Sequence, residues 1–117
     1  MRPWLSAALA VSLAASAVPV AAGYCEAVVV GVRPVSQYDH AAGRGFLAVR
    51  EGPGTSHRQV GELYLGDLVE VTGRHGAWLL VSCQQGLCRT PLWGTPWPQG
   101  WSHGRYLRLE SGPGICP

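Results

Sequence analysis

Residues 46–56 read FLAVREGPGTS, a short alternating strand that breaks into a Gly-Pro-Gly turn. Downstream, residues 100–107 read GWSHGRYL, in which a Gly-Trp strand ends in a Tyr-Leu pair. Short strands separated by glycine and proline turns are typical of small all-β domains. The two stretches therefore predict where one such domain begins and ends.

The sequence around these stretches continues the same rhythm. Strands are expected at residues 27–30, 45–50, 60–65, 68–72, 77–83, 100–102 and 106–109, with glycine turns at 66–67 and 73–76. Alternation places Leu47 and Val49 on one face of their strand. It places Val69 and Val71 inward and Glu70 outward on another. The pattern predicts a small all-β barrel or sandwich.

Two segments interrupt the strands. Residues 33–44 are polar and punctuated by Pro and Gly, and are expected to form a loop. Residues 89–99 contain three prolines and two tryptophans. Because proline fixes φ and lacks the backbone donor of a sheet ladder, this second segment is expected to be an irregular loop.

Residues 1–22 are predicted to be a signal peptide. Arg2 supplies a positive start, the stretch from Leu5 to about Val18 is apolar, and Ala22 ends a run of small residues. An apolar stretch of roughly 14–16 residues is shorter than the roughly 20 that span a bilayer as a helix. We therefore expect cleavage after Ala22, a periplasmic or secreted mature chain, and no stable membrane span in it.

The cysteines all follow the expected cleavage point, at Cys25, Cys83, Cys88 and Cys116. An even number in a small exported chain predicts two disulfides, with three possible connectivities. We favour Cys83–Cys88 across a hairpin loop, with Cys25–Cys116 joining the two ends. The spacing lacks the clustered Cys and His of a zinc site, so no metal and no cofactor are expected.

Charge and side-chain chemistry exclude other classes. The nine basic residues are all arginines, set singly along the chain against seven acids, so nucleic-acid binding has little electrostatic support. A cysteine nucleophile would need a free thiol, which disulfide pairing removes. Asp39 and His40 are adjacent on a loop, which does not position a base. Glu62 and Asp67 flank a turn and are expected to be solvated. We therefore do not expect an enzyme.

Several short motifs follow one another in order between residues 46 and 107. The matching residues are Leu47, Val49, Arg50, Gly52, Pro53 and Gly54; Val60, Gly61 and Leu63; Gly66, Asp67, Val69 and Val71; Gly76 and Trp78; and Gly100, Trp101, Tyr106 and Leu107. In this order they resemble bacterial SH3-like (SH3b) domains. The resemblance implies an SH3-like barrel of about five to seven short strands, here stabilised by disulfides.

The resemblance also implies an organisation of the chain. An SH3-like domain is expected at 46–109 with a Cys/Trp/Pro insertion at 84–99, preceded by an N-terminal strand and loop at 23–45 and followed by a tail at 110–117. Two positions depart from the family pattern. Ala48 stands where an Asn is usual, which puts any role of that Asn in doubt, and Ser102 stands where an apolar residue usually follows the Trp.

SH3b relatives are often wall-targeting modules, so the resemblance implies an exported binding module for cell-wall peptide, peptidoglycan or a periplasmic protein partner. Aromatic side chains offer large contact areas at low entropic cost. The candidate ligand contacts are Trp78, Trp93, Trp97, Trp101 and Tyr106. Alternatively, Trp78 and Trp101 are core residues at the barrel edge, and Trp93 and Trp97 fold back over an open barrel end. The alternative function is a structural or accessory subunit of a periplasmic complex that docks by this Trp/Pro loop. A secreted enzyme or small inhibitor is the remote alternative.

Overall fold

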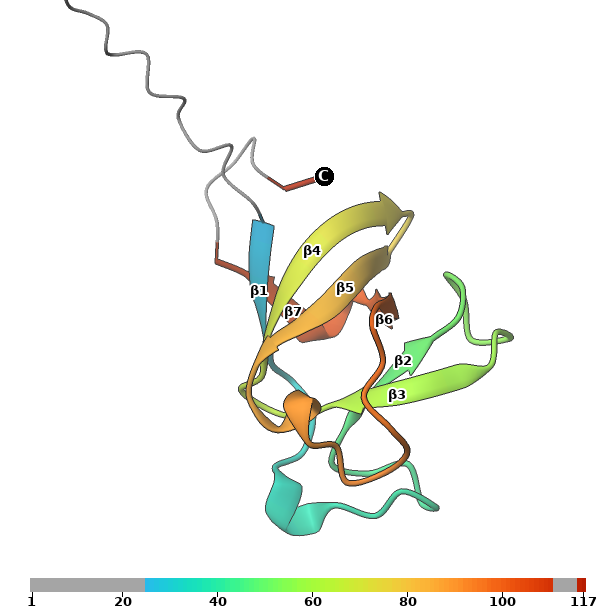
Figure 1. The fold of residues 1–117 in the computed structure, drawn as a ribbon, viewed down its shortest axis with the longest axis vertical. Coiled ribbons are helices and arrows are strands. Elements are labelled where there is room, and N and C mark those ends of the chain that lie inside the picture. Colours follow the sequence, from blue (N-terminus) through green and yellow to red (C-terminus); the bar gives the residue numbers. More distant parts are fainter. Residues whose placement is uncertain (1–24, 111–115) are drawn as a thin grey trace, which may run out of the picture.

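The computed structural model describes residues 25–110 and 116–117, which form one antiparallel sheet of seven short strands (Figure 1). The strands are β1 (Cys25–Val29), β2 (Leu47–Arg50), β3 (Gln59–Leu63), β4 (Leu68–His75), β5 (Trp78–Gln85), β6 (Gly100–His103) and β7 (Leu107–Leu109). The described residues also form three 3-10 helices, which are η2 (Val35–Gln37), η3 (Leu87–Arg89) and η4 (Gly104–Tyr106). The same residues contain no α-helix. The expected all-β fold is confirmed. The expected signal peptide at 1–22, with its cleavage after Ala22, lies outside the described residues.

The strand order is β3-β2-β6-β5-β4-β1-β7, so β1 lies between β4 and β7 (Figure 1). The strand that precedes the family motifs is thus an interior member of the sheet. A disulfide joins its first residue, Cys25, to Cys116, and a second disulfide joins Cys83 to Cys88. The favoured connectivity is confirmed.

Alternation along the strands decides which side chains enter the core. Leu47 and Val49 of β2 are buried, as are Val69 and Val71 of β4, while Glu70 between them is partly exposed. The expected faces of both strands are confirmed. These side chains pack into one hydrophobic cluster with residues of the other strands, among them Val29, Leu63, Leu79, Val81 and Leu107. The sheet therefore curls around a single core.

The segment between the paired cysteines differs from the expected hairpin. Cys83 lies in β5, but Cys88 lies in η3 and not in a facing strand. The Asp67 carboxylate accepts the backbone N–H groups of Leu87 (2.9 Å) and Cys88 (3.0 Å), which holds a helical turn in place. Gly86 allows this approach, since it has φ 122° and any Cβ would lie 2.2 Å from Asp67 Oδ1.

Two further local expectations are corrected. The turn expected at residues 73–76 is narrower, because β4 continues to His75 and pairs with Trp78 of β5. A register shift between Val71 and Gly73 leaves Thr72 of β4 without a partner residue in β5. The loop at residues 33–44 contains η2 and an isolated bridge between Asp39 and Arg44, so its backbone is partly hydrogen-bonded.

Candidate ligand-binding pocket

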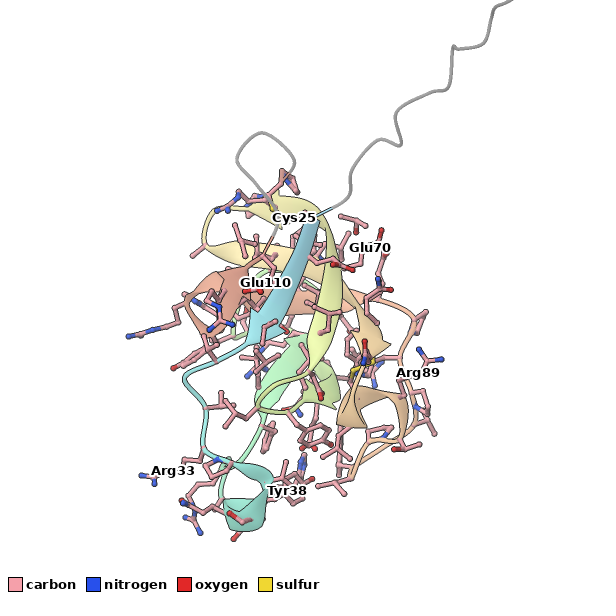
Figure 2. The ribbon with its side chains drawn as sticks, turned by 90° about the vertical axis from the view of Figure 1, so that its left-hand side faces the viewer. Cys25, Arg33, Tyr38, Glu70, Arg89 and Glu110 are labelled. Atoms are coloured by element: carbon pink, nitrogen blue, oxygen red, sulfur yellow. A yellow bond between two sulfur atoms is a disulfide. The ribbon has the colours of Figure 1, made fainter. Side chains whose placement is uncertain are left out.

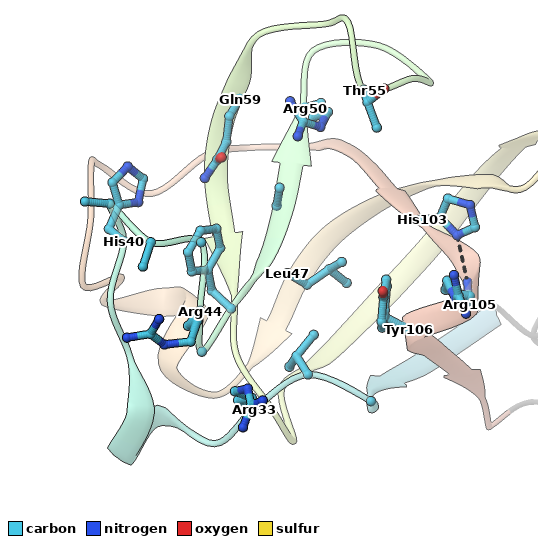
Figure 3. Close-up of a pocket in the computed structure, with 18 of the residues that line it drawn as sticks. Arg33, His40, Arg44, Leu47, Arg50, Thr55, Gln59, His103, Arg105 and Tyr106 are labelled. Atoms are coloured by element: carbon cyan, nitrogen blue, oxygen red, sulfur yellow. Dashed lines mark hydrogen bonds between the residues drawn. The ribbon is translucent and has the colours of Figure 1, made fainter.

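A surface pocket of about 720 Å³ crosses the outer side of β2. Figure 3 shows Leu47 near its middle, with His40 and Arg44 to one side and His103 and Tyr106 to the other. One wall comes from the loop before β2, and the opposite wall from β5, β6 and η4. Segments distant in the sequence therefore meet at this pocket.

The wall on the β6 side is aromatic. Trp78 lies opposite His103 in the β5–β6 register, and their rings meet edge to face at 5.2 Å. The His103 ring also meets the Tyr106 ring, at 6.4 Å. His103 Nδ1 accepts the backbone N–H of Arg105 at 3.2 Å, which caps η4 and orients this wall. The three rings thus form one aromatic surface, and they are attached to the hydrogen-bonded backbone of β5, β6 and η4.

The pocket is also basic. Arg33, Arg44, Arg50 and Arg105 line it, and none of the described lining residues is Asp or Glu. The Arg105 guanidinium lies 5.5 Å from the centre of the Tyr106 ring, a cation–π arrangement. Arg50 Nη1 donates to the His57 carbonyl at 3.0 Å. Charged and aromatic groups are thus presented together.

The structure separates the five aromatic residues proposed from the sequence. Trp78 and Tyr106 line the pocket. Trp101, which is partly buried and lies between Arg50 and Leu80 in the sheet register, does not line it. The five candidates therefore do not share one groove. The sheet register places Trp101 on the same outer face as Trp78 and Arg50, but outside the pocket lining, and Trp93 and Trp97 lie in the Trp/Pro loop.

Trp97 belongs to the core. It is 7% exposed and packs over Gly61, where any Cβ would lie 1.9 Å from the indole Cδ1. It folds back onto the sheet, in line with the alternative that it packs against the protein, and its small exposed part borders a shallow surface hollow beside Pro96 and Pro98. Trp93 is half-buried and stacks on His40, with ring centres 4.3 Å apart.

A buried carboxylate next to the pocket was missed by sequence reasoning. Glu62 is 0% exposed, and its Oε1 accepts the hydroxyls of Tyr38 (2.8 Å) and Tyr64 (2.6 Å). Its Oε2 lies 2.6 Å from Nδ1 of His40, a residue that also lines the pocket. The Tyr64 hydroxyl in turn accepts the backbone N–H of Leu92 at 2.7 Å. This Glu62 network joins β3 to the loop before β2 and to the Trp/Pro loop.

The expectation that Glu62 and Asp67 are solvated is wrong. Glu62 faces the outer side of β3, opposite Ala48, as alternation requires, but the loop carrying Tyr38 and His40 covers that side. Asp67 is buried by η3, and its carboxylate also accepts the Tyr64 N–H at 2.9 Å. Burial raises the pKa of Asp67, and its three backbone donors partly oppose that rise. The residues next to Glu62 and Asp67 in the sequence do not indicate that a distant loop or helix will bury these carboxylates.

The Glu62 network predicts an alkaline transition. Burial, and then the hydrogen bond to Glu62, raise the pKa of Tyr38 to about 12, and the same causes raise the pKa of Tyr64. Since ordinary tyrosine titrates near about 10, the stability from these protonated hydroxyls is complete below that pH and lost as the pH rises through the folded-state value.

We expect the phenolate absorbance of the native protein to lag behind that of the urea-unfolded protein in an alkaline titration. Tyr38→Phe should remove part of this lag, because it removes one of the two hydroxyls that donate to Glu62. Identical titrations of native and unfolded protein would contradict the network.

Other site types find no support among the described residues. Within 25–110 and 116–117, no group of three His, Cys, Asp or Glu side chains is placed to hold a metal ion. No helix in this part of the chain is long and apolar enough to cross a membrane.

The two departures from the family pattern contact each other. Ser102 is buried, and its hydroxyl donates to the Ala48 carbonyl at 2.9 Å. The bond links β6 to β2 beside the short pairing of Arg50 with Trp101. The buried serine is therefore satisfied, as a buried hydroxyl requires.

Comparison with known proteins agrees with the fold. A family model described as bacterial SH3 domain matches residues 45–108. No curated protein and no solved structure matches the chain. SH3b domains generally bind cell-wall peptides, and the match identifies no catalytic domain. With the family match covering more than half of its length, the chain belongs to the bacterial SH3 domain family and is an SH3b binding module.

Proposed function

We propose that this protein is an exported SH3b module that binds cell-envelope peptide in the pocket across β2. The observation that carries the proposal is the meeting of an aromatic wall, Trp78 with Tyr106, and several arginines in one pocket of about 720 Å³. Aromatic side chains with few rotatable bonds bind a peptide at low entropic cost, and strands hold them more firmly than free loops do. Peptidoglycan peptide is the proposed ligand, and a periplasmic protein segment is the alternative occupant.

An extracytoplasmic location fits this role. The two disulfides and the family indicate a protein outside the reducing cytosol. We propose that residues 1–22 direct export, that cleavage follows Ala22, and that the mature protein acts in the periplasm or after secretion.

The accessory-subunit alternative requires the Trp/Pro loop to be free to dock. Trp97 is in the core, and Trp93 is stacked on His40. Leu92, at 49% exposed, is the large apolar side chain that this loop offers to a partner. One exposed leucine is a small surface for docking to a partner subunit, whereas the pocket combines aromatic and charged residues. We therefore favour peptide binding over the accessory-subunit function.

Sedimentation with purified peptidoglycan tests the proposed function. We expect the wild-type protein to sediment with it, and Trp78→Ala to weaken the association roughly tenfold or more, since truncation of a central aromatic contact typically costs about 1–3 kcal/mol. Leu92→Ala is the control, because this exposed side chain does not line the pocket. Circular dichroism and the urea midpoint establish that each variant is folded.

Two results would contradict the proposal. Absence of wild-type sedimentation would reject peptidoglycan as the ligand. Equal sedimentation of the wild type and a folded Trp78→Ala variant would reject this pocket as the binding site.

A further inference from the structure

We propose that the pocket selects a peptide bearing free carboxylates, and that Arg33 and Arg105 recognise them. The inference rests on the proposed function and adds the chemical class of the ligand. It follows from how charge is distributed over the described residues.

The acids outside the pocket are already engaged or distant. Glu62 and Asp67 are buried with their own partners. Glu51 pairs with Arg58, and Glu110 pairs with Arg108 at 2.8 Å. Glu51, Asp67 and Glu110 are thus held by partners outside the pocket lining, whereas Glu62 contacts the lining residue His40 and none of the pocket arginines.

The other three acidic residues leave the positive charge of most pocket arginines without a neighbouring carboxylate. Asp39 lies 3.5 Å from Arg44 and offsets that one guanidinium. Glu26 and Glu70 face each other across β1 and β4, strands that contribute no residue to the pocket lining. Figure 2 shows Glu70 toward the end of the molecule that carries Cys25, and Arg33 toward the opposite end. Within the described residues, Arg33, Arg50 and Arg105 line the pocket without an ion-pair partner.

The placement of these arginines suits an extended anionic ligand. Figure 3 shows Arg33 below Leu47 and Arg105 to its right, so the two arginines border the pocket on different sides. A guanidinium presents parallel N–H donors that match the two oxygens of a carboxylate. The Trp78 and Tyr106 rings beside Arg105 provide apolar contact for the adjoining backbone or side chains. A peptide with a carboxylate at either wall satisfies both features.

A short peptide fits better than a charged polymer. The pocket of about 720 Å³ is the size of a small-ligand site, which typically measures about 300–1,000 Å³. The pocket arginines are few and set around one cavity, whereas binding to a nucleic-acid or phosphate polymer relies on extended rows of basic residues.

Chemical amidation of the ligand tests the inference. Purified peptidoglycan, stripped of covalently attached phosphate polymers, is divided, and one portion is treated with carbodiimide and ammonia so that its free carboxylates become amides. We expect the full-length mature protein to bind the untreated portion and to lose roughly tenfold or more of its affinity for the amidated portion. Added salt should weaken the first interaction more than the second, because it screens exposed charges.

A pair of double variants locates the effect. Arg33→Gln with Arg105→Gln should reduce binding to untreated peptidoglycan to the level seen with amidated material. Arg89→Gln with Arg108→Gln changes the net charge equally, outside the pocket, and should bind as the wild type does. Tri-L-glutamate, a short peptide with several carboxylates, serves as a second, soluble probe for both pairs.

The outcomes separate the two proposals. Equal binding to both portions overturns carboxylate selection and leaves the proposed function standing. Binding to tri-L-glutamate through Arg33 and Arg105 without peptidoglycan binding rejects the proposed function and supports the carboxylate ligand. Binding to neither probe overturns both, and equal loss in the two double variants overturns the assignment to these arginines.

Discussion

Glu62→Ala is expected to lower the free energy of unfolding by about 2–4 kcal/mol, the combined range for a buried hydroxyl left without its acceptor and for a new cavity. The carboxylate is fully buried and is the shared acceptor of the Tyr38 and Tyr64 hydroxyls. Its removal leaves the buried Tyr64 hydroxyl without its acceptor, leaves His40 without its acidic partner, and opens a cavity where the side chain stood. Urea unfolding with both disulfides intact measures the change.

Two control variants show whether this loss of stability comes from the Glu62 network. Glu70→Ala removes a partly exposed carboxylate of β4 and should change stability by about 0.5 kcal/mol or less. Glu62→Gln keeps the shape and one acceptor oxygen, so a smaller loss of about 1–2 kcal/mol is expected. If Glu62→Ala were no more damaging than Glu70→Ala, the Glu62 network would not stabilise the fold.

Removal of the Cys25–Cys116 disulfide by paired serine substitutions is expected to cost about 4–5 kcal/mol in the chain-entropy model. The bond spans a sequence separation of 91 residues, so its loss releases most of the unfolded chain from a constraint. It also frees the start of β1, an interior strand of the sheet, from Cys116. Urea midpoints of the purified variants measure the effect.

The second disulfide is the internal control. Cys83–Cys88 has a sequence separation of only 5, for which the same model gives about 2 kcal/mol. The corresponding serine pair should therefore be the less damaging of the two. A larger loss from the short loop would show that native packing around η3, and not chain entropy, sets the contribution of these bonds.

Much of the fold was predictable because strand patterns are local. Leu47 with Val49, and Val69 with Val71, enter the core as the two-residue period requires. The disulfide pairing followed from counting cysteines and judging which could face each other. The expected hairpin at Cys83–Cys88 was wrong because Asp67, a residue distant in the sequence, holds η3 in place.

The candidate site was only partly predictable. Trp78 and Tyr106 were identified as candidates and line the pocket, but Trp97 was grouped with them and lies in the core. Composition marks a tryptophan as a strong contact residue without telling whether its partner is a ligand or the protein itself. Gly61 receives the Trp97 indole, and no local pattern connects these two positions.

By itself, the sequence determined the all-β class, the family motifs, the expectation of two disulfides and the inward faces of β2 and β4. These properties depend on alternation, turn residues and spacing, which act over a few neighbouring positions. Only the tertiary structure decided that Arg33 and Arg105 face one pocket, that Trp97 fills the core, and that His40 and Glu62 meet. Those outcomes depend on how loops pack against strands far away in the chain, where burial and hydrogen bonding between distant side chains override what each segment would do alone.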